Sequence, residues 1–180
     1  MKYIIFIIFF SILLFSCSKI EKTGSEVSGD PALRDLVQHV NPLMGTFSTF
    51  RFSHGNVYPA IGRPWGMNTW TAQTGEMGSG WIYQYQKDSI NGFRQTHQPS
   101  PWMNDYGCFS IMPLTGDLQV TIRERASSFS HDTEIARPEY YQVFLKDHNV
   151  MAELTPTERA AILRFTFPET EKAFIILDYF

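Results

Sequence analysis

The chain has 180 residues, 43% of them hydrophobic, and its 15 basic and 18 acidic residues leave a formal net charge of −3. This near balance, without a basic stripe, excludes the electrostatic footprint of a nucleic-acid-binding protein. The length is enough for one domain with a hydrophobic core after the N-terminal segment is set aside.

The first residues, 1–16, have the pattern of an export signal. Lys2 gives a basic start, and residues 3–15 are almost unbroken Ile, Phe and Leu, a length typical of a signal-peptide core and short for a membrane span. Ser16 and Cys17 close the run as a small residue before a cysteine, which resembles the bacterial lipobox. The resemblance implies cleavage before Cys17 and acylation of its thiol. An ordinary signal peptide with an incidental cysteine is the alternative.

A tether and a short helix are expected next. Residues 17–30 are polar, contain Gly and Ser and show no periodicity, so they predict a flexible tether. Asp30 can cap a helix whose first turn holds Pro31, and Asn41–Pro42 ends it. Four apolar residues share one face of this predicted helix: Leu33, Leu36, Val37 and Val40. The domain itself is therefore predicted to occupy residues 31–180.

An aromatic, glycine-rich stretch runs from Asn56 to Gly107. It holds all four tryptophans of the chain: Trp65, Trp70, Trp81 and Trp102. Indole is costly to leave in water, whereas Gly, Asn, Gln and Ser are too polar to fill an interior. A sugar would suit this mixture, because its C–H faces stack on aromatic rings and its hydroxyls take hydrogen bonds. An aromatic-rich core of irregular loops is the alternative. Short strands at best are expected here, such as Gly80–Tyr85.

Period-two alternation after Cys108 predicts antiparallel strands. The segments with this pattern are Leu118–Arg123, Tyr141–Lys146 with a break at Phe144, Val150–Leu154, Leu163–Phe167 and the apolar run Ala173–Phe180. Turn-forming residues separate them at 115–117, 146–149 and 168–169. Short strands at this spacing predict an all-β antiparallel β-sandwich. Because an exposed apolar terminal strand aggregates, the run at 173–180 also predicts further residues beyond Phe180. Cys108 itself is predicted to be a buried free thiol.

No catalytic pair or metal motif stands out. The five histidines are scattered without ligand spacing. Asp105 lies beside Trp102 and Tyr106, where desolvation could raise its pKa, although an aspartate before such a turn is usually a turn former. The other carboxylates weighed for glycoside hydrolysis are Glu76 and Asp88, and they offer no convincing pair. Asp132 and Glu134 are interpreted as loop or strand-end charges.

Three polar residues beside aromatics are candidates for ligand contacts. Arg63 precedes Pro64–Trp65, Arg94 follows Phe93, and His97 could donate to a hydroxyl while neutral. Hydrogen bonds that brace loops are the alternative role for each.

Several segments, taken together, resemble the N-terminal domain of glycoside hydrolase family 92, the exo-acting α-mannosidases. They are Val40–Thr46, Pro64–Met67, Gly80–Trp81, Ile90–Phe93, Thr96–His97, Phe129–His131, Tyr140–Val143, Ala152–Arg159 and Arg164–Pro168. Their order and spacing cover nearly all of residues 35–180, and no single short motif carries the resemblance.

The resemblance implies a β-sandwich followed by a larger (α/α)6 barrel, with the active site between the two domains. It implies inverting, calcium-dependent hydrolysis of mannose-containing glycans, with α-1,2 linkages as the expected type. The general acid and base belong to the second domain, so this chain holds no catalytic residue and would be inactive alone. Calcium ligands are not assigned. The substrate-binding residues expected in this chain are Trp70, Trp81, Arg63, His97, Trp102 and Asp105.

The chain departs from the family pattern on the substrate side. Trp65 stands where many relatives carry Phe, and Arg94–Gln95 replaces Ser-His before Thr96–His97. A Ser/Gly-rich stretch is replaced by Gln98–Trp102.

Two other functions fit the sequence. One is a free-standing carbohydrate-binding lipoprotein module, and the other is a structural lipoprotein domain without a ligand. The expected location of the protein is the bacterial cell envelope, with the lipid anchor on Cys17.

Overall fold

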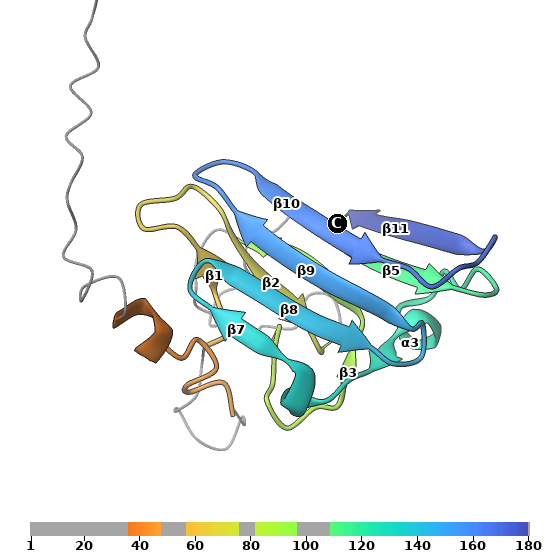
Figure 1. Ribbon diagram of the computed structural model, residues 1–180, viewed down its shortest axis with the longest axis horizontal. Coiled ribbons are helices and arrows are strands. Elements are labelled where there is room, and N and C mark those ends of the chain that lie inside the picture. The colour runs from red at the N-terminus through yellow and green to blue at the C-terminus, as the bar shows by residue number, and fades with distance from the viewer. Residues whose placement is uncertain (1–35, 48–56, 76–81, 97–108, 180) are drawn as a thin grey trace, which may run out of the picture. The chain divides into compact units, whose positions relative to one another are not determined.

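The computed structural model of this chain describes residues 36–47, 57–75, 82–96 and 109–179. Its strands pair antiparallel in two main sheets and one small sheet (Figure 1). The five-stranded sheet has the order β1 (Ile61–Gly62), β2 (Thr69–Gln73), β4 (Gly92–Thr96), β5 (Phe109–Thr115) and β11 (Ala173–Tyr179). The four-stranded sheet has the order β10 (Ala161–Thr166), β9 (Val150–Pro156), β8 (Tyr140–Leu145) and β7 (Ile135–Arg137). The small sheet joins β3 (Ser89–Ile90) to β6 (Ser127–Ser128). The predicted all-β antiparallel class is confirmed.

The core lies between the two main sheets. In β8 and β9 every second side chain is buried, and the register pairs Val143 with Ala152, so both strands turn their apolar residues to one face. The opposite wall includes Phe93 of β4, whose ring centroid lies 6.3 Å from that of Tyr141 and 6.0 Å from that of Phe165. Burying each such side chain contributes about 1.5–3 kcal/mol to the free energy of unfolding.

Four predicted strands and their turns are confirmed. β8, β9, β10 and β11 fall on the alternating segments predicted for them, and β8 continues through Phe144 without a break. Asn149, with φ of 52°, lies in the turn between β8 and β9, and Gly116, with φ of 85°, follows the end of β5 at the first predicted turn. These residue types tolerate that left-handed conformation, which explains why they mark the ends of strands.

The predicted strand Leu118–Arg123 is wrong. Residues 118–120 are irregular, with Leu118 and Val120 exposed, and α3 (Ile122–Arg125) follows as a single turn. Alternation makes a strand only where a neighbour completes the ladder, and β5 has already ended at Thr115. The segment is instead held by Arg125, whose guanidinium is buried, donates to the carbonyl of Val120 at 2.9 Å and pairs with Asp178.

The strand predicted at Gly80–Tyr85 is also absent where residues 82–85 are described. Ile82 and Tyr83 are both buried although they are adjacent, so the chain does not alternate between two faces here. The carbonyl of Ile82 instead accepts hydrogen bonds from the N–H groups of Thr74 and Gly75. The longest described strands of the aromatic stretch are β2 and β4, which pair Ala72 with Phe93.

The helices of the described residues are single turns: η1 (Leu36–His39), α3 and η2 (His131–Thr133). None of them is long and apolar enough to cross a membrane. The predicted helix after Pro31 is seen only in its last part, as η1, where Leu36 and Val37 are exposed instead of packed. Its beginning, together with Cys17, lies outside the described residues.

Candidate functional site

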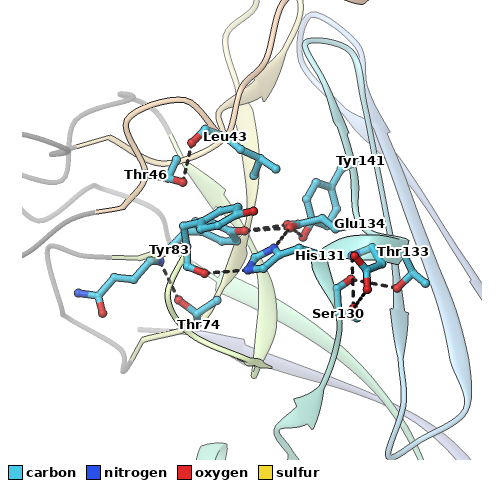
Figure 2. Close-up of polar contacts among 12 residues, drawn as sticks. Leu43, Thr46, Thr74, Tyr83, Ser130, His131, Thr133, Glu134 and Tyr141 are labelled. Carbon is cyan, nitrogen blue, oxygen red and sulfur yellow. Dashed lines mark hydrogen bonds and ion pairs between the residues drawn. The ribbon is translucent and has the colours of Figure 1, made fainter.

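The centre of the candidate site is the carboxylate of Glu134, whose side chain is fully buried. Figure 2 shows three side chains converging on it. Tyr83 Oη donates to Oε1 at 2.9 Å and Oε2 at 3.0 Å, and Tyr141 Oη donates to Oε1 at 2.5 Å. The ring nitrogen Nδ1 of His131 lies 2.5 Å from Oε2. Tyr83, which is 51 residues away in the sequence, therefore meets residues 131–141 at one carboxyl group.

A capped turn places Glu134 and His131 on the same side of the chain. Ser130 caps η2, because its side chain accepts from the N–H of Asp132 and its carbonyl accepts from the N–H of Thr133. The single turn then puts His131 and Glu134 at positions i and i+3, where side chains can meet.

His131 makes contacts with acceptors through both ring nitrogens. Its Nε2 lies 2.7 Å from the carbonyl oxygen of Tyr85, opposite the contact of Nδ1 with Glu134. The ring therefore bridges the carboxyl group of Glu134 and the backbone at Tyr85. The ring also stacks on that of Tyr85, with centroids 3.9 Å apart and planes at 10°.

The two tyrosines at the site stay neutral. Burial first, and then the charge of Glu134, raises the pKa of Tyr83 and Tyr141 well above the usual range for a phenol. They are therefore permanent hydrogen-bond donors to the carboxylate. Because Glu134 is buried and already accepts several bonds, it is a structural charge and not a general base.

An open groove of about 480 Å³ lies beside this cluster. It is lined by Phe47, Tyr85, Gln86, Lys87, Asp88, Phe129, Ser130, His131 and Asp132. The rings of Phe47 and Tyr85 are exposed there. Segment 43–47 is tied to the groove by the N–H of Tyr85, which donates to the carbonyl of Thr46 at 3.1 Å. Exposed aromatic rings among charged and amide groups suit a ligand with apolar faces and many hydroxyls.

The hairpin turn between β1 and β2 displays a second polar and aromatic group. Arg63 is exposed there, and Trp65 is 98% exposed with φ of 62°. The turn is anchored to the β9–β10 turn, because Met67 N–H donates to Glu158 O at 2.6 Å and Asn68 Nδ2 donates to Thr157 O at 3.2 Å. The indole of Trp65 lies at the surface of this anchored turn, and it is not among the substrate-binding residues expected from the sequence.

Trp70 lies in the core. The residue is only 4% exposed. Its Nε1 donates to Asn68 Oδ1 at 2.8 Å, and its ring packs edge-on against that of Phe109. This burial counts against direct stacking on a sugar, and its expected substrate contact stays a prediction. The other expected binding residues, Trp81, His97, Trp102 and Asp105, lie outside the described residues.

Among the remaining candidates, Asp88 lines the groove together with Asp132. Arg94 is buried on the face of the five-stranded sheet that points away from Phe93.

The sequence analysis did not predict that Glu134, Tyr83 and Tyr141 form a cluster. The local signal was present in Ser130-His131-Asp132-Thr133-Glu134, a cap residue followed by His and Glu three positions apart.

The described residues offer no ligand set for calcium. No group of three or more His, Cys, Asp or Glu side chains that could hold a metal ion occurs within ranges 36–47, 57–75, 82–96 and 109–179. We therefore derive no chemical step from calcium in this part of the chain.

Comparison with known proteins gives consistent matches. Residues 39–180 match the family described as the glycosyl hydrolase family 92 N-terminal domain. The family GH92 inverting mannosidase BT2199 from Bacteroides thetaiotaomicron is 54% identical, with a TM-score of 0.74 over 79% of this chain and 19% of its own. The GH92 α-mannosidase BT3965 from the same organism is 35% identical, with a TM-score of 0.71 over 80% of this chain and 20% of its own.

A curated relative points the same way. An uncharacterized secreted glycosidase from Arthroderma benhamiae is 25% identical over 141 residues, which are 74% of this chain and 18% of the relative. The chain spans about a fifth of the length of these relatives.

Proposed function

Because the chain belongs to glycoside hydrolase family 92, we propose that it forms the N-terminal, substrate-binding part of an inverting exo-α-mannosidase. The observation that carries the proposal is the 54% identity to an inverting mannosidase over 79% of this chain. Mannose-containing glycans are the proposed substrates, with α-1,2 linkages preferred and calcium required. The catalytic acid and base would lie in the part of the family polypeptide outside this chain.

The described residues support a binding role and not a catalytic one. The buried carboxylate of Glu134 is held by two tyrosines and His131, so it cannot reach a glycosidic bond. The groove beside it presents aromatic rings and hydroxyl-binding groups instead. We propose that Trp81, Arg63, His97, Trp102 and Asp105 contribute further contacts to the sugar, together with Trp70.

The first test measures hydrolysis of an aryl α-mannoside. We expect no turnover by the purified 180-residue chain, and turnover by a longer polypeptide in which the family's remaining four fifths follow it. Removal of calcium with a chelator should abolish that turnover, and polarimetry should show inversion at the anomeric carbon. Turnover by the short chain, or none by the folded longer one, would reject the proposal.

A second test concerns the stacking residue. In the longer, active polypeptide, Trp81→Ala should lower kcat/KM by an amount equivalent to about 1–3 kcal/mol, because stacking area and pocket shape are lost. Leu118→Ala, which removes an exposed apolar side chain that does not line the groove, is the control. Unchanged kinetics in a folded Trp81→Ala protein would remove Trp81 from the site.

We also propose export and lipid anchoring through Cys17 in a bacterial envelope. The secreted relative supports export, and the lipobox-like sequence supports the anchor. Labelling of cells with a fatty-acid analogue should mark the protein, and Cys17→Ser should remove the label. A protein that stays unlabelled and is released from the membrane by salt would contradict the anchor.

A second candidate function is a non-catalytic carbohydrate-binding module, favoured by the open groove with exposed Phe47 and Tyr85. Calorimetry of the 180-residue chain with mannose oligosaccharides distinguishes the two. Binding that is lost in Tyr85→Ala, with no hydrolysis in any longer form, would support the module.

A further inference from the structure

The apolar side chains of β11 face the core side of the sandwich but remain uncovered. The register aligns Leu177 with Ile111, and Ile111 with Phe93, whose ring packs against both Tyr141 and Phe165. Directly paired residues of antiparallel strands point to the same face, so Leu177 faces inward with its neighbours Ile175 and Tyr179. Yet these three residues are 62%, 57% and 87% exposed.

β10 forms the opposite wall of the same opening. Its inward residues are Leu163 and Phe165, followed by Phe167, and all three are only partly buried although they pack against the core. β10 and β11 are the last strands of their sheets, and in the described ranges no strand pairs with the outer edge of either. We name this opening, bounded by Leu163, Phe165, Phe167, Ile175, Leu177 and Tyr179, the β10–β11 seam.

Both free edges lie on one side of the sandwich (Figure 1). At the other end of the five-stranded sheet, β1 is joined to the β7–β8 turn, where Gly62 N–H donates to Pro138 O at 2.8 Å. β10 and β11 are the opposite ends of these two sheets. The sandwich is therefore closed on the β1–β7 side and open on the β10–β11 side.

The inward face of β11 is fixed by a charge on its other face. Asp178 pairs with the buried guanidinium of Arg125, which comes from α3. A one-residue slip of β11 would pull Asp178 from Arg125 and turn it into the seam. The exposure of Ile175 and Leu177 is therefore set by the register and is not a loose strand end.

We propose that the β10–β11 seam is a docking site for β-strands supplied by the rest of the family polypeptide. The solved relatives carry about four fifths of their length outside the part that this chain matches, so in those proteins a candidate occupant belongs to the same polypeptide. An edge strand presents a row of unpaired N–H and C=O groups, which is a template for pairing with another strand. The occupant would extend both sheets and present apolar residues at alternate positions to Leu177 and Phe165.

A second copy of this chain fits less well. A symmetric pairing of two β11 strands would extend the five-stranded sheet but would leave the edge of β10 open. Strands from the same polypeptide can complete both sheets at once. The proposal depends on membership of the family and not on mannosidase activity.

The test compares one substitution in two settings. The first is the 180-residue chain alone, and the second is a chimera in which this chain replaces the matched 19% of the BT2199 chain. Leu177→Lys should leave the melting temperature of the short chain unchanged within about 2 °C, because the residue is exposed there. In the chimera it should lower the melting temperature by at least about 5 °C, because a charge is buried in the seam. Amide exchange in β11 should also be slower in the parent chimera than in the short chain.

Ile162→Lys is the matched control. Ile162 lies on the outward face of β10 and is 65% exposed, close to the value for Leu177, so its substitution should be tolerated in both settings. If Leu177→Lys prevents folding of the chimera, Leu177→Ala provides a milder variant with the same expected direction.

Three outcomes would overturn the proposal. Leu177→Lys could be tolerated equally in both settings, or β11 amides could exchange equally fast in both. Light scattering could also show a dimer of the short chain that Leu177→Lys dissociates, which would make a second copy the occupant. None of these measurements uses activity, so a folded chimera that hydrolyses no mannoside would reject the proposed function and leave the seam proposal standing.

Discussion

At the scale of single residues, two histidines each join separate parts of the chain through both ring nitrogens. His131 contacts the carboxyl group of Glu134 through Nδ1 and the carbonyl of Tyr85 through Nε2. His148 lies between two backbone groups, because its Nε2 is 2.8 Å from the carbonyl of Arg125 and its Nδ1 accepts from the N–H of Thr115 at 3.5 Å. The same side chain thus links a carboxyl group to the backbone in one place and two backbone segments in the other.

Glu134→Ala should destabilise the protein strongly. It leaves the ring of His131 without its carboxyl partner and the hydroxyls of Tyr83 and Tyr141 without their acceptor. Breaking one partner of a buried pair costs about 3–5 kcal/mol, which urea unfolding would measure as a lower midpoint. Glu139→Ala, at an exposed position five residues along, should change stability by no more than about 0.5 kcal/mol. Equal effects of the two substitutions would remove Glu134 from its central role.

Alkaline pH should destabilise the fold through its tyrosines. Burial first, and then the hydrogen bond to Glu153, raises the pKa of Tyr140 to about 12 from 10.0, and the pKa values of Tyr83 and Tyr141 are raised further. In this range the native state binds more protons than the unfolded chain, so the free energy of unfolding falls as pH rises. The contribution of Tyr140 is complete below pH 10 and is lost as pH passes through about 12.

Urea midpoints measured across this window, with tyrosinate absorbance recorded on the folded protein, check the prediction. Tyr140→Phe should reduce the decline between pH 10 and about 12. A folded protein whose tyrosines all ionise near pH 10, with stability independent of pH, would contradict it.

At the scale of elements, a strand exists where a neighbour completes its ladder. β9 lies between β8 and β10, with Leu154 paired to Tyr141 on one side and to Leu163 on the other. Residues 118–120 alternate between apolar and polar side chains just as well, but they have no partner strand. They form an irregular segment before α3. Pairing, and not alternation alone, decides which segment becomes a strand.

Leu154→Ala should therefore cost about 2–5 kcal/mol, because it opens a cavity in the central strand between the two sheets. Ile162→Ala removes a similar volume from the exposed face of β10 and should cost much less. Thermal unfolding of both variants is the measurement. A similar loss of stability in both would mean that β9 is not held mainly by its buried face.

At the scale of the whole molecule, the sandwich is closed on one side and open on the other. Gly62 binds the β7–β8 turn on the closed side, whereas Leu177 and Ile175 stand uncovered at the β10–β11 seam. The chain also spans only about a fifth of its relatives. We propose that this chain supplies substrate-binding residues, and that the catalytic residues lie elsewhere on the family polypeptide.

The strands from Tyr140 to Tyr179 and the family could both be predicted from the order of residues alone. Each of these strands has one buried face, so its alternation is written directly in the residues, as in Val143, Leu145 and Ala152. The family resemblance rested on many short segments in order, and the match of residues 39–180 confirms it. The candidate sugar contacts came from composition and from the family resemblance, and they stay predictions.

The surroundings of each polar or aromatic side chain could not be predicted from the sequence and are seen only in the folded structure. The sequence analysis interpreted Glu134 as a loop or strand-end charge. In the fold, Tyr83 and Tyr141, which are 51 and 7 residues away, donate hydrogen bonds to it. The sequence analysis expected Trp70 to bind substrate, and in the fold β2 places its indole against the ring of Phe109. The physical reason is that local pattern reports which face of an element is apolar, whereas desolvation and hydrogen-bond partners depend on segments that the chain brings together only on folding.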